Sequence, residues 1–469
     1  MEVQSSLYYA LVIGSGVCVT ILGVVSLKKP FFTYVRKVSI QLNIVLDTGL
    51  SEKERDREII KNLGKVLYWQ FIVIIAALLS VLIGLFPIGI FTVIYPQFPL
   101  DFETVYFYGA LTLGSLVFVF FKKKGEYSYW SKLFHTVILE NYGIGKFLLK
   151  RELRKHGDKN ATAKFVVITG LARSGTTALT NKLFDTGRFH ALTYANMPFL
   201  MAPKSWSKLY KAKSKALKER MHGDHIKISK NSIEALEEYF FKVMLNDAFV
   251  KETCLEEHEI SDQIFDTYLE YQSLNAKSGK TIYLAKNNNL MLRLKSMRKH
   301  SGDFKVICLI REPVDHALSL KRQHELFVHK QSEDPFILDY MTWLGHYEFG
   351  LNQKAFNFSN TLPDSNEVES LDYWLGLWIN YYGYVRKHLH ELGITLMSFE
   401  ELSERPDETL QRVAEVTEIS FDSLDDKSFS KQRTASDEDR SNIDIDILKE
   451  ANDIYSELMT HSRKSGQRV

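Results

Sequence analysis

Long apolar runs occur only in the first 125 residues of the chain. The first covers residues 6–27, the second residues 66–95 with Pro87 inside it, and the third residues 103–121, where a triple lysine ends it. About 20 apolar residues in helical conformation are enough to cross a bilayer. We therefore predict a transmembrane anchor over residues 1–125 with three spans, in preference to buried helices of a soluble protein.

The distribution of positive charge predicts the orientation of this anchor. Residues 28–65 contain many lysines and arginines, whereas residues 96–104 contain none. Because cytoplasmic loops are enriched in Lys and Arg, the N-terminus should lie outside and residues 28–65 inside. The domain after the anchor then faces the cytoplasm. Within the inner connector, residues 51–54 start a charged helix that either lies on the membrane or continues into the second span.

The pattern changes after an aromatic and basic stretch at residues 126–160, which we interpret as an interfacial linker. Short apolar runs rich in β-branched residues then recur at residues 165–168, 281–286, 304–310 and 394–399. Such runs are typical of strands buried on both faces of a parallel sheet. The sequence predicts an α/β domain over residues 161–469, with a P-loop-type parallel sheet flanked by helices.

A glycine-containing loop follows the first of these strands. Gly170, Gly175 and Thr177 are spaced as in the phosphate-binding Walker A loop, but Thr176 occupies the position of its lysine. A strand, a glycine loop and a helix N-terminus together can hold an anion with backbone N–H groups. A simple glycine turn is the alternative. The missing lysine and the presence of Arg173 favour a phosphorylated ligand other than a hydrolysed nucleoside triphosphate.

A second anion-binding position is predicted after the strand at residues 304–310. Arg311 would lie at the carboxyl end of that strand, where open α/β sheets bind ligands. Pro313 suits the first turn of the next helix, and Ser319 would lie two turns along it. The alternative is that Arg311 is a surface cation and Ser319 has no role.

With these two motifs, the chain resembles the sulfotransferases that use 3′-phosphoadenosine-5′-phosphosulfate (PAPS). Residues 173–177, Arg-Ser-Gly-Thr-Thr, match the loop that binds the 5′-phosphosulfate in that family. The resemblance implies that Arg173, Ser174, Gly175, Thr176 and Thr177 bind this group. It also implies that Arg311 and Ser319 bind the 3′-phosphate, although the late Arg-Lys-Gly triplet of cytosolic members is not found.

The resemblance also bears on the catalytic residues. Lys286 matches a lysine that ends a strand in many members and would stabilise charge on the bridging oxygen. Asn196 and Asn288 stand where relatives carry a carboxylate and a histidine, and an amide does not accept a proton in their place. We therefore predict that Asp224, with His222, takes the proton of the acceptor. A metal is not expected.

Composition restricts the remaining possibilities. The formal net charge is +2 in 469 residues, so no nucleic-acid surface is expected. The three cysteines do not suggest a disulfide framework, which favours a reducing compartment. We expect a membrane-anchored, PAPS-dependent sulfotransferase whose acceptor is a lipid or carbohydrate hydroxyl, with membrane lipids as partners. The alternatives are a divergent P-loop kinase or NTPase and a membrane protein that binds a nucleotide without turnover.

Overall fold

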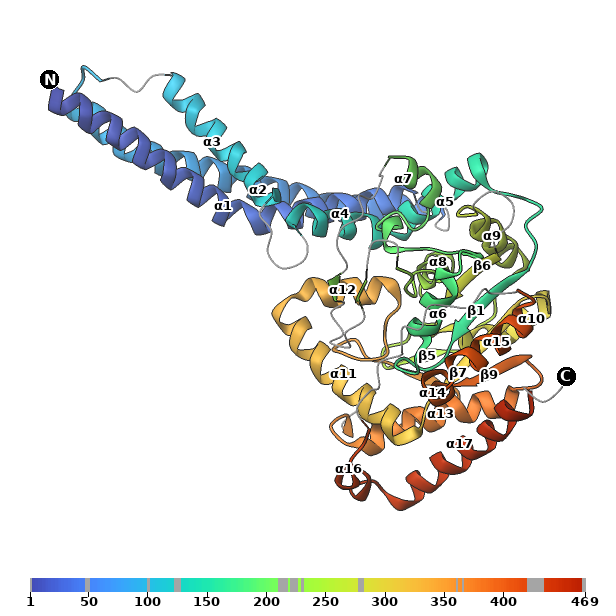
Figure 1. Ribbon diagram of the computed structural model, residues 1–469. Coiled ribbons are helices and arrows are strands. Elements are labelled where there is room, and N and C mark those ends of the chain that lie inside the picture. The colour runs from blue at the N-terminus through green and yellow to red at the C-terminus, as the bar shows by residue number, and fades with distance from the viewer. Residues whose placement is uncertain are drawn as a thin grey trace. The chain divides into compact units, whose positions relative to one another are not determined.

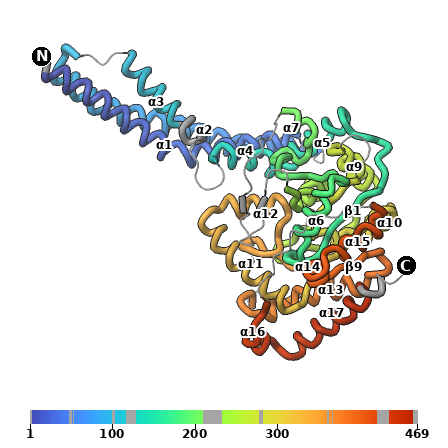
Figure 2. Tube along the Cα trace, viewed as in Figure 1, coloured from blue at the N-terminus to red at the C-terminus, as the bar shows by residue number. Residues whose placement is uncertain are grey.

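The computed structural model describes residues 2–46, 51–98, 102–121, 128–209, 218–219, 227–228, 232–276, 282–359, 362–364, 367–419 and 434–465. The chain divides into two compact units, residues 1–147 and residues 148–469. Figure 1 labels the helices and strands, and Figure 2 follows the same chain as a tube.

The first unit is helical. Its helices are α1 (Glu2–Leu46), α2 (Glu52–Ile94), α3 (Phe102–Phe121) and α4 (Tyr129–Leu139), followed by the start of α5 (Tyr142–His156). Helices α1 and α2 lie side by side along their length (Figures 1 and 2). Among the described residues, these two helices are long and apolar enough to cross a membrane, over Val3–Leu46 and Lys53–Ile94. The third predicted span corresponds to α3.

The surface and interior of this helical unit suit a bilayer. Large apolar side chains such as Ile13, Ile21 and Phe86 are more than half exposed. Between the helices, small residues allow close approach, and a Cβ on Gly23 would lie 2.8 Å from Ser115. Small residues at helix contacts and outward apolar side chains are features of membrane helices.

The described residues of the predicted inner connector belong to α1 and α2, with Ser51 as the N-cap of α2. Helix α1 continues to Leu46, and α2 begins after Ser51, which forms a capping box with Glu54. The charged helix at residues 51–54 therefore continues into the second predicted span. Polar contacts hold this region, including a hydrogen bond of 2.8 Å from Asn62 Nδ2 to Gln41 Oε1. An ion pair joins Arg36 of α1 to Glu140 after α4.

The second unit is built on a parallel five-stranded sheet in the order β2-β6-β1-β7-β9. Its strands are β1 (Phe165–Thr169), β2 (Phe189–His190), β6 (Ile282–Lys286), β7 (Lys305–Ile310) and β9 (Ile394–Ser398). Four of these strands match the apolar runs of the sequence, so the predicted α/β fold with a parallel sheet is confirmed. Since all strands run in one direction, their carboxyl ends share one edge.

Helices cover both faces of this sheet. Val166 and Ile168 of β1 pack with Leu179 of α6 (Thr176–Asp185) and with Leu410 of α15 (Pro406–Thr417). Helix α13 (Leu371–His388) contributes the buried Tyr382, whose hydroxyl donates to the carbonyl of Leu309 over 2.7 Å. The aromatic residues of α13 are therefore core residues.

The other elements lie between and around these helices. They are η1 (Tyr194–Asn196), α7 (Pro203–Leu209), β3 (Lys218–Glu219), β4 (Lys227–Ile228), α8 (Glu238–Leu245), β5 (Cys254–Glu256), α9 (Asp262–Ser273), η2 (Leu290–Leu292), α10 (Leu294–His300), α11 (Pro313–Glu333), α12 (Pro335–Leu344), β8 (Ala355–Asn357), α14 (Phe399–Glu404), α16 (Asp437–Ser441) and α17 (Ile445–Ser465). The pattern of residues 232–238 is that of a helix start with Ser232 as N-cap. This interpretation is wrong, because α8 begins only at Glu238.

Candidate functional site

The loop between β1 and α6 has an unusual backbone. Gly170, Arg173 and Gly175 have φ values of 142°, 73° and 97°. A Cβ on Gly170 would lie 2.6 Å from the carbonyl oxygen of Leu309, and one on Gly175 would lie 2.6 Å from the Phe399 ring. Both positions therefore require glycine for space as well as for conformation. Alternation of left- and right-handed residues is the geometry of an anion-binding nest.

Helix α6 adds its N-terminus to this loop. Gly175 is the N-cap and provides no side-chain hydrogen bond to the first turn. Ser174, Thr176 and Thr177 are buried beside it. Their backbone N–H groups lie at the positive end of the helix dipole, where an anion is stabilised. The loop therefore has the backbone, the helix and the side chains of a phosphate or sulfate site.

Arg173, Arg311 and Ser319 come together at the edge of this loop. Arg173 Nε donates to Ser319 Oγ over 3.4 Å, and Arg311 Nη1 contacts the carbonyl of Arg173 at 3.5 Å. Arg311 directly follows β7, and Ser319 lies on α11, as the sequence predicted. The guanidinium of Arg311 is stacked over Phe399 at 5.0 Å. Two guanidinium groups and a hydroxyl thus lie together where the loop meets α11, and Arg311 with Ser319 forms a candidate second position for an anion.

The buried His316 holds the backbone of the loop through a hydrogen bond. His316 Nε2 lies 2.7 Å from the carbonyl of Ala172 and must donate to it, which fixes the tautomer. Burial, with the nearby Arg311 charge, lowers the pKa of His316 to about 3. The imidazole is therefore neutral and acts as a hydrogen-bond donor that holds the loop.

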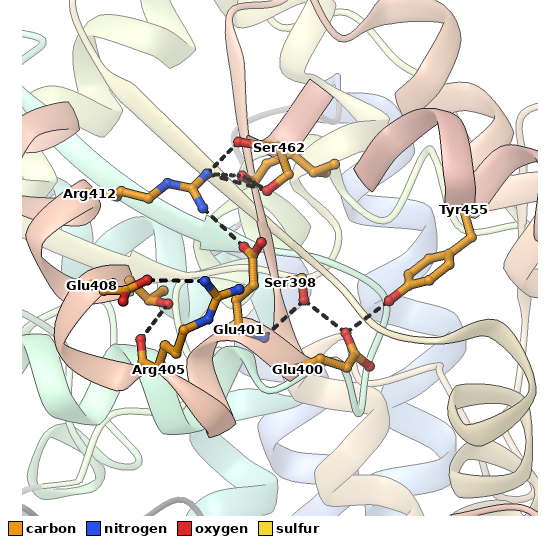
Figure 3. A network of polar contacts seen from close by, with 10 residues as sticks. Ser398, Glu400, Glu401, Arg405, Glu408, Arg412, Tyr455 and Ser462 are labelled. Atoms are coloured by element: carbon orange, nitrogen blue, oxygen red, sulfur yellow. Dashed lines mark hydrogen bonds and ion pairs between the residues drawn. The ribbon is translucent and has the colours of Figure 1, made fainter. Parts of the chain in front are cut away.

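Carboxylates surround the N-terminus of α11, and one of them links it to the C-terminal helix. Glu400 Oε1 accepts from the backbone N–H of Glu312 over 2.9 Å, and its Oε2 accepts from Ser398 and Tyr455. Figure 3 shows Ser398 and Tyr455 converging on Glu400, beside a second group in which Arg412 contacts Glu401 and Ser462. Helix α17 is thereby attached to the edge of the sheet that carries the two predicted anion positions.

Arg440 of α16 compensates for two of these carboxylates. It pairs with Glu312 Oε1 at 3.0 Å and with Asp315 Oδ1 at 3.5 Å. Burial lowers the pKa of Arg311, but the charges of Asp315, Glu400 and Glu312 oppose that effect. Arg440 therefore limits the negative charge near Arg311.

Lys286 ends β6 at the same edge of the sheet and is buried. Its Nζ donates to Glu234 Oε2 over 2.7 Å, with side-chain exposures of 7% and 6%. The lysine that the sequence selected is therefore held by a carboxylate that it did not select. A buried ion pair of this kind is costly to desolvate and strongly destabilising to break. Such a pair fixes the ammonium group in one position.

Further carboxylates support the turn after Lys286. Asn287 Nδ2 lies 3.0 Å from both Glu237 Oε1 and Glu238 Oε2, and Arg293 forms a bidentate pair with Glu238. Tyr268 donates to Glu237 Oε2 over 2.8 Å. Burial raises the pKa of Glu237 to about 7, although the hydrogen bonds from Tyr268 and Asn287 oppose this shift.

Asn288 connects this turn to Glu348. Its Nδ2 donates to Glu348 Oε1 over 2.7 Å. Burial alone would raise the pKa of Glu348, but the nearby His346, 3.8 Å away, and the hydrogen bond from Asn288 hold this pKa below the usual value. Glu348 is therefore an ionised carboxylate next to the position where relatives carry histidine.

The remaining predictions from the sequence concern the proton acceptor, Asn196 and metal binding. His222 and Asp224, the predicted proton acceptors, lie outside the described residues. Asn196 is buried and accepts from the backbone N–H of Thr193, so its contacts cap η1. Within the described part of the chain, no group of three His, Cys, Asp or Glu side chains is arranged to hold a metal.

Sequence reasoning did not select Glu234 or Glu348. Glu234 belongs to residues 232–238, whose pattern indicates only the start of a helix, yet Glu234, Glu237 and Glu238 are all buried. The sequence does contain one indication of this burial. The carboxylates directly precede the apolar stretch Tyr239–Phe241, which is buried in the core. Their partners lie near residues 286–293, which a local pattern does not reveal.

The sequence profile described as "Sulfotransferase family" matches residues 166–423, more than half of the chain. Solved structures with similarity include a sulfotransferase from Alicyclobacillus acidocaldarius, at 15% identity and a TM-score of 0.33, over 66% of this chain and 100% of that one. Sulfotransferase STF9 from Mycobacterium avium has 13% identity and a TM-score of 0.39, over 64% and 75% of the two chains.

Sulfotransferase STF1 from Mycobacterium tuberculosis has 10% identity and a TM-score of 0.34, over 71% of this chain and 88% of that one. No curated protein matches the sequence. The match to the family profile includes nearly all of β1 and the loop after it, and also Lys286, Arg311 and Ser319. This loop and these three residues lie at the carboxyl edge of the sheet. The chain belongs to the sulfotransferase family.

Proposed function

We propose that this sulfotransferase transfers a sulfuryl group from PAPS to a hydroxyl of a lipid or carbohydrate acceptor at the cytoplasmic face of a membrane. The convergence of Arg173, Arg311 and Ser319 on the loop after β1 is the observation that carries this proposal. It provides two adjacent anion positions, as a nucleotide with separate 5′ and 3′ charged groups requires.

The residues present fit such a donor. The loop conformation at Arg173 and Gly175 forms a concave nest, and the N-terminus of α6 faces it. Arg173, Ser174, Gly175, Thr176 and Thr177 would bind the 5′-phosphosulfate. Arg311 and Ser319 would bind the 3′-phosphate, with the planar guanidinium suited to its oxygens.

The chemistry would need one positive charge and one proton acceptor. When bound, PAPS supplies the sulfuryl group and leaves as the 3′,5′-bisphosphate PAP. The acceptor oxygen forms a bond to sulfur, the bond from sulfur to the bridging oxygen breaks, and the acceptor proton is released. Lys286, fixed by Glu234 at 2.7 Å, would stabilise the negative charge on the bridging oxygen.

The acceptor proton has two candidate destinations. Asp224, with His222, is the assignment that the sequence suggested. Glu234 is the other, because a carboxylate bonded to Lys286 lies beside the reacting groups. The variants Glu234→Gln and Asp224→Asn distinguish the two candidates. The substitution of the residue that accepts the proton should abolish turnover, and the other substitution should leave turnover largely intact.

A membrane location is proposed from the first unit. Helices α1 and α2 are candidate spans, and the basic residues between their apolar parts support a cytoplasmic position for this connector. A cytoplasmic catalytic domain has direct access to PAPS. An acceptor that resides in the membrane, such as a lipid or a lipid-linked sugar, would explain why the enzyme carries such an anchor.

Calorimetry and a turnover assay test the proposal. The full-length protein in phospholipid nanodiscs should bind PAP, and should bind ATP and GTP much more weakly. Labelled PAPS should then yield labelled product from a membrane lipid extract. Tight binding of ATP without PAP binding would indicate a nucleotide-triphosphate enzyme, and PAP binding without any labelled product would indicate a binding protein.

A further inference from the structure

The loop after β1 contains a tight turn at residues 171–174. The backbone N–H of Ser174 donates to the carbonyl of Leu171 over 3.2 Å, which closes the turn. Arg173, the third residue of the turn, has a φ of 73°, whereas Ala172 is not among the residues with a positive φ in the described part of the chain. These features define a type II turn, whose third position favours glycine. An arginine in this position holds the backbone in a conformation that costs free energy.

The peptide between Ala172 and Arg173 decides which backbone groups the turn presents. In a type I turn, which most residues tolerate, Arg173 would have a negative φ and this peptide would be rotated by roughly 180°. The C=O and N–H groups of one trans peptide point in opposite directions. Rotation would therefore exchange the places of the Ala172 carbonyl and the Arg173 N–H, so that an acceptor would replace a donor on one side of the loop.

His316 opposes this rotation. Its Nε2 donates to the carbonyl of Ala172 over 2.7 Å. The ring is completely buried, and its Nδ1 has no hydrogen-bond partner within the described part of the chain. If the peptide rotated, the buried N–H of His316 would lose its acceptor, which is energetically costly. The hydrogen bond therefore offsets the strain at Arg173 and keeps the turn in its observed form.

Helix α11 holds the same turn at a second point. Ser319 lies three residues after His316, on the same face of the helix, and accepts from Arg173 Nε over 3.4 Å. The carbonyl of Ala172 and the side chain of Arg173 are thus both bound to α11. Because the Ala172 carbonyl points to His316, the backbone N–H of Arg173 points away from it.

We infer that His316 is a positioning residue for the donor, because its bond to the Ala172 carbonyl keeps the Arg173 N–H directed at the 5′-phosphosulfate. After rotation of the peptide, the carbonyl oxygen would take that place, and its partial negative charge would repel the anion. His316 acts through the backbone and not by contact with the donor. The inference rests on the proposed function, since it takes the loop as the binding position of the 5′-phosphosulfate.

Ligands with one phosphate each test this role. With the full-length protein in nanodiscs, competition against labelled PAP measures the affinities of adenosine 5′-monophosphate and adenosine 3′-monophosphate. His316→Met should weaken binding of the 5′-monophosphate roughly tenfold and that of the 3′-monophosphate by less than about twofold. His316→Gln keeps an N–H donor at the end of the side chain and should restore most of the affinity.

Several outcomes would overturn the inference. These are equal losses for the two ligands, equal losses in the Met and Gln variants, and no loss in a variant that melts cooperatively. A wild-type protein that does not bind PAP would instead contradict the proposed function. His300→Met is the control, because it removes a histidine bond of 3.0 Å to the carbonyl of Ile260 on α10, the helix before β7. Both affinities should be unchanged in this control, and a selective loss there would also count against His316.

Arg173→Gly separates the orientation of the peptide from other effects of His316. Glycine favours the third position of a type II turn, so the turn no longer depends on the hydrogen bond from His316. The single variant should bind the 5′-monophosphate more weakly, because it lacks the guanidinium group. Adding His316→Met should then weaken binding by less than about twofold. A further loss of roughly tenfold would show that His316 does not act through this peptide.

Discussion

Arg173 and Ser319 are 146 residues apart in the chain, yet Arg173 Nε donates to Ser319 Oγ over 3.4 Å. This contact joins the loop after β1 to helix α11, so the two proposed anion positions share a border. Arg311, 3.5 Å from the carbonyl of Arg173, completes this border. Because the two anion positions are adjacent but separate, a substitution in one of them is expected to weaken the binding of one charged group of the donor more than that of the other.

The variant Arg311→Ala tests the proposed 3′-phosphate position. A hydrogen bond to a charged group contributes about 1.5–3 kcal/mol, so PAP should bind roughly tenfold or more weakly. Adenosine 5′-phosphosulfate lacks the 3′-phosphate and should lose little. Calorimetry with both ligands measures this difference. Arg405→Ala, which removes an exposed arginine paired with Glu408, is the control. Equal losses for the two ligands would refute the assignment of Arg311.

Lys286→Met should reduce turnover by roughly 10²–10³-fold while PAP still binds, because the bridging oxygen loses its positive charge. The substitution also leaves Glu234 buried without its partner, at a cost of about 3–5 kcal/mol.

A double variant separates these two effects. Lys286→Met with Glu234→Gln removes the unpaired charge and should recover most of the thermal stability. Turnover should stay low. Recovery of turnover together with stability would show that Lys286 has only a structural role. Single-turnover rates and melting temperatures of Lys286→Met, Glu234→Gln and the double variant provide the comparison, and the Glu234→Gln variant shows how much of the loss of turnover is due to Glu234.

Arg440→Gln should weaken PAP binding although Arg440 is not among the predicted phosphate ligands. It pairs with Glu312 and Asp315, and without it both carboxylates would repel the donor. The expected loss is roughly three- to tenfold at low salt and smaller at high salt. Adding Asp315→Asn should restore part of the affinity.

Arg386→Gln is a matched control for this variant. Arg386 pairs with Glu457 of α17 at 3.4 Å, so the same type of ion pair is removed elsewhere on the C-terminal helix. PAP affinity should be unchanged there. A loss of similar size in both variants would mean that Arg440 acts through general attachment of the C-terminal helices.

Glu237 should make stability depend on pH. Burial raises its pKa from 4.5 to about 7 in the folded protein, so the folded state retains a proton that the unfolded chain has released. The contribution to stability is complete below pH 4.5 and decreases as pH rises towards 7. At 1.36 kcal/mol per pKa unit, the full effect is roughly 3 kcal/mol.

Melting curves of wild type and Glu237→Gln between pH 5 and 8 isolate this contribution. The melting temperature of the wild type should fall relative to that of the variant between pH 5 and 7, and the difference should then level off. A difference that does not vary with pH would show that Glu237 is ionised throughout.

The orientation of the anchor can be tested with single cysteines. Ser51→Cys lies at the start of α2, and Gln97→Cys follows its end. Each cysteine is introduced into a variant whose native cysteines, Cys18, Cys254 and Cys308, have been replaced. In intact cells that express these variants, a membrane-impermeant maleimide should label position 97 from outside and position 51 only after permeabilisation. The reverse pattern would place the catalytic domain on the other side of the membrane.

The proposed donor side of the site could be inferred from the sequence for a physical reason. Its chemistry follows directly after two strands, β1 and β7, and apolar runs make such strands visible. Gly170 and Arg311 are each adjacent to the end of a strand. Because β1 and β7 are neighbouring parallel strands, these two residues lie at the same edge of the sheet. Recognising the two strands is therefore enough to predict that the residues are close together.

The acceptor side was less predictable because its contacts depend on tertiary structure. Glu234 is 52 residues from its partner Lys286, and Asn288 is 60 residues from Glu348. The pattern of residues 232–238 indicates the start of a helix, and it does not show that the glutamates in it are buried. Their burial became evident only from the packing of Tyr268 and Arg293 around them.

The ring of Phe399 lies under both proposed anion positions. It is close enough to Gly175 to exclude a side chain there, and Arg311 stacks over it at 5.0 Å. In the proposed complex, this one ring would lie beside the residues that hold both charged ends of the nucleotide. Binding of the 3′-phosphate and of the 5′-phosphosulfate should be cooperative, and a double-mutant cycle between Phe399→Leu and Arg311→Ala should show a coupling free energy clearly different from zero. A donor without the 3′-phosphate would then lose more than one contact, since it would also lose the ordering of the loop that carries Gly175.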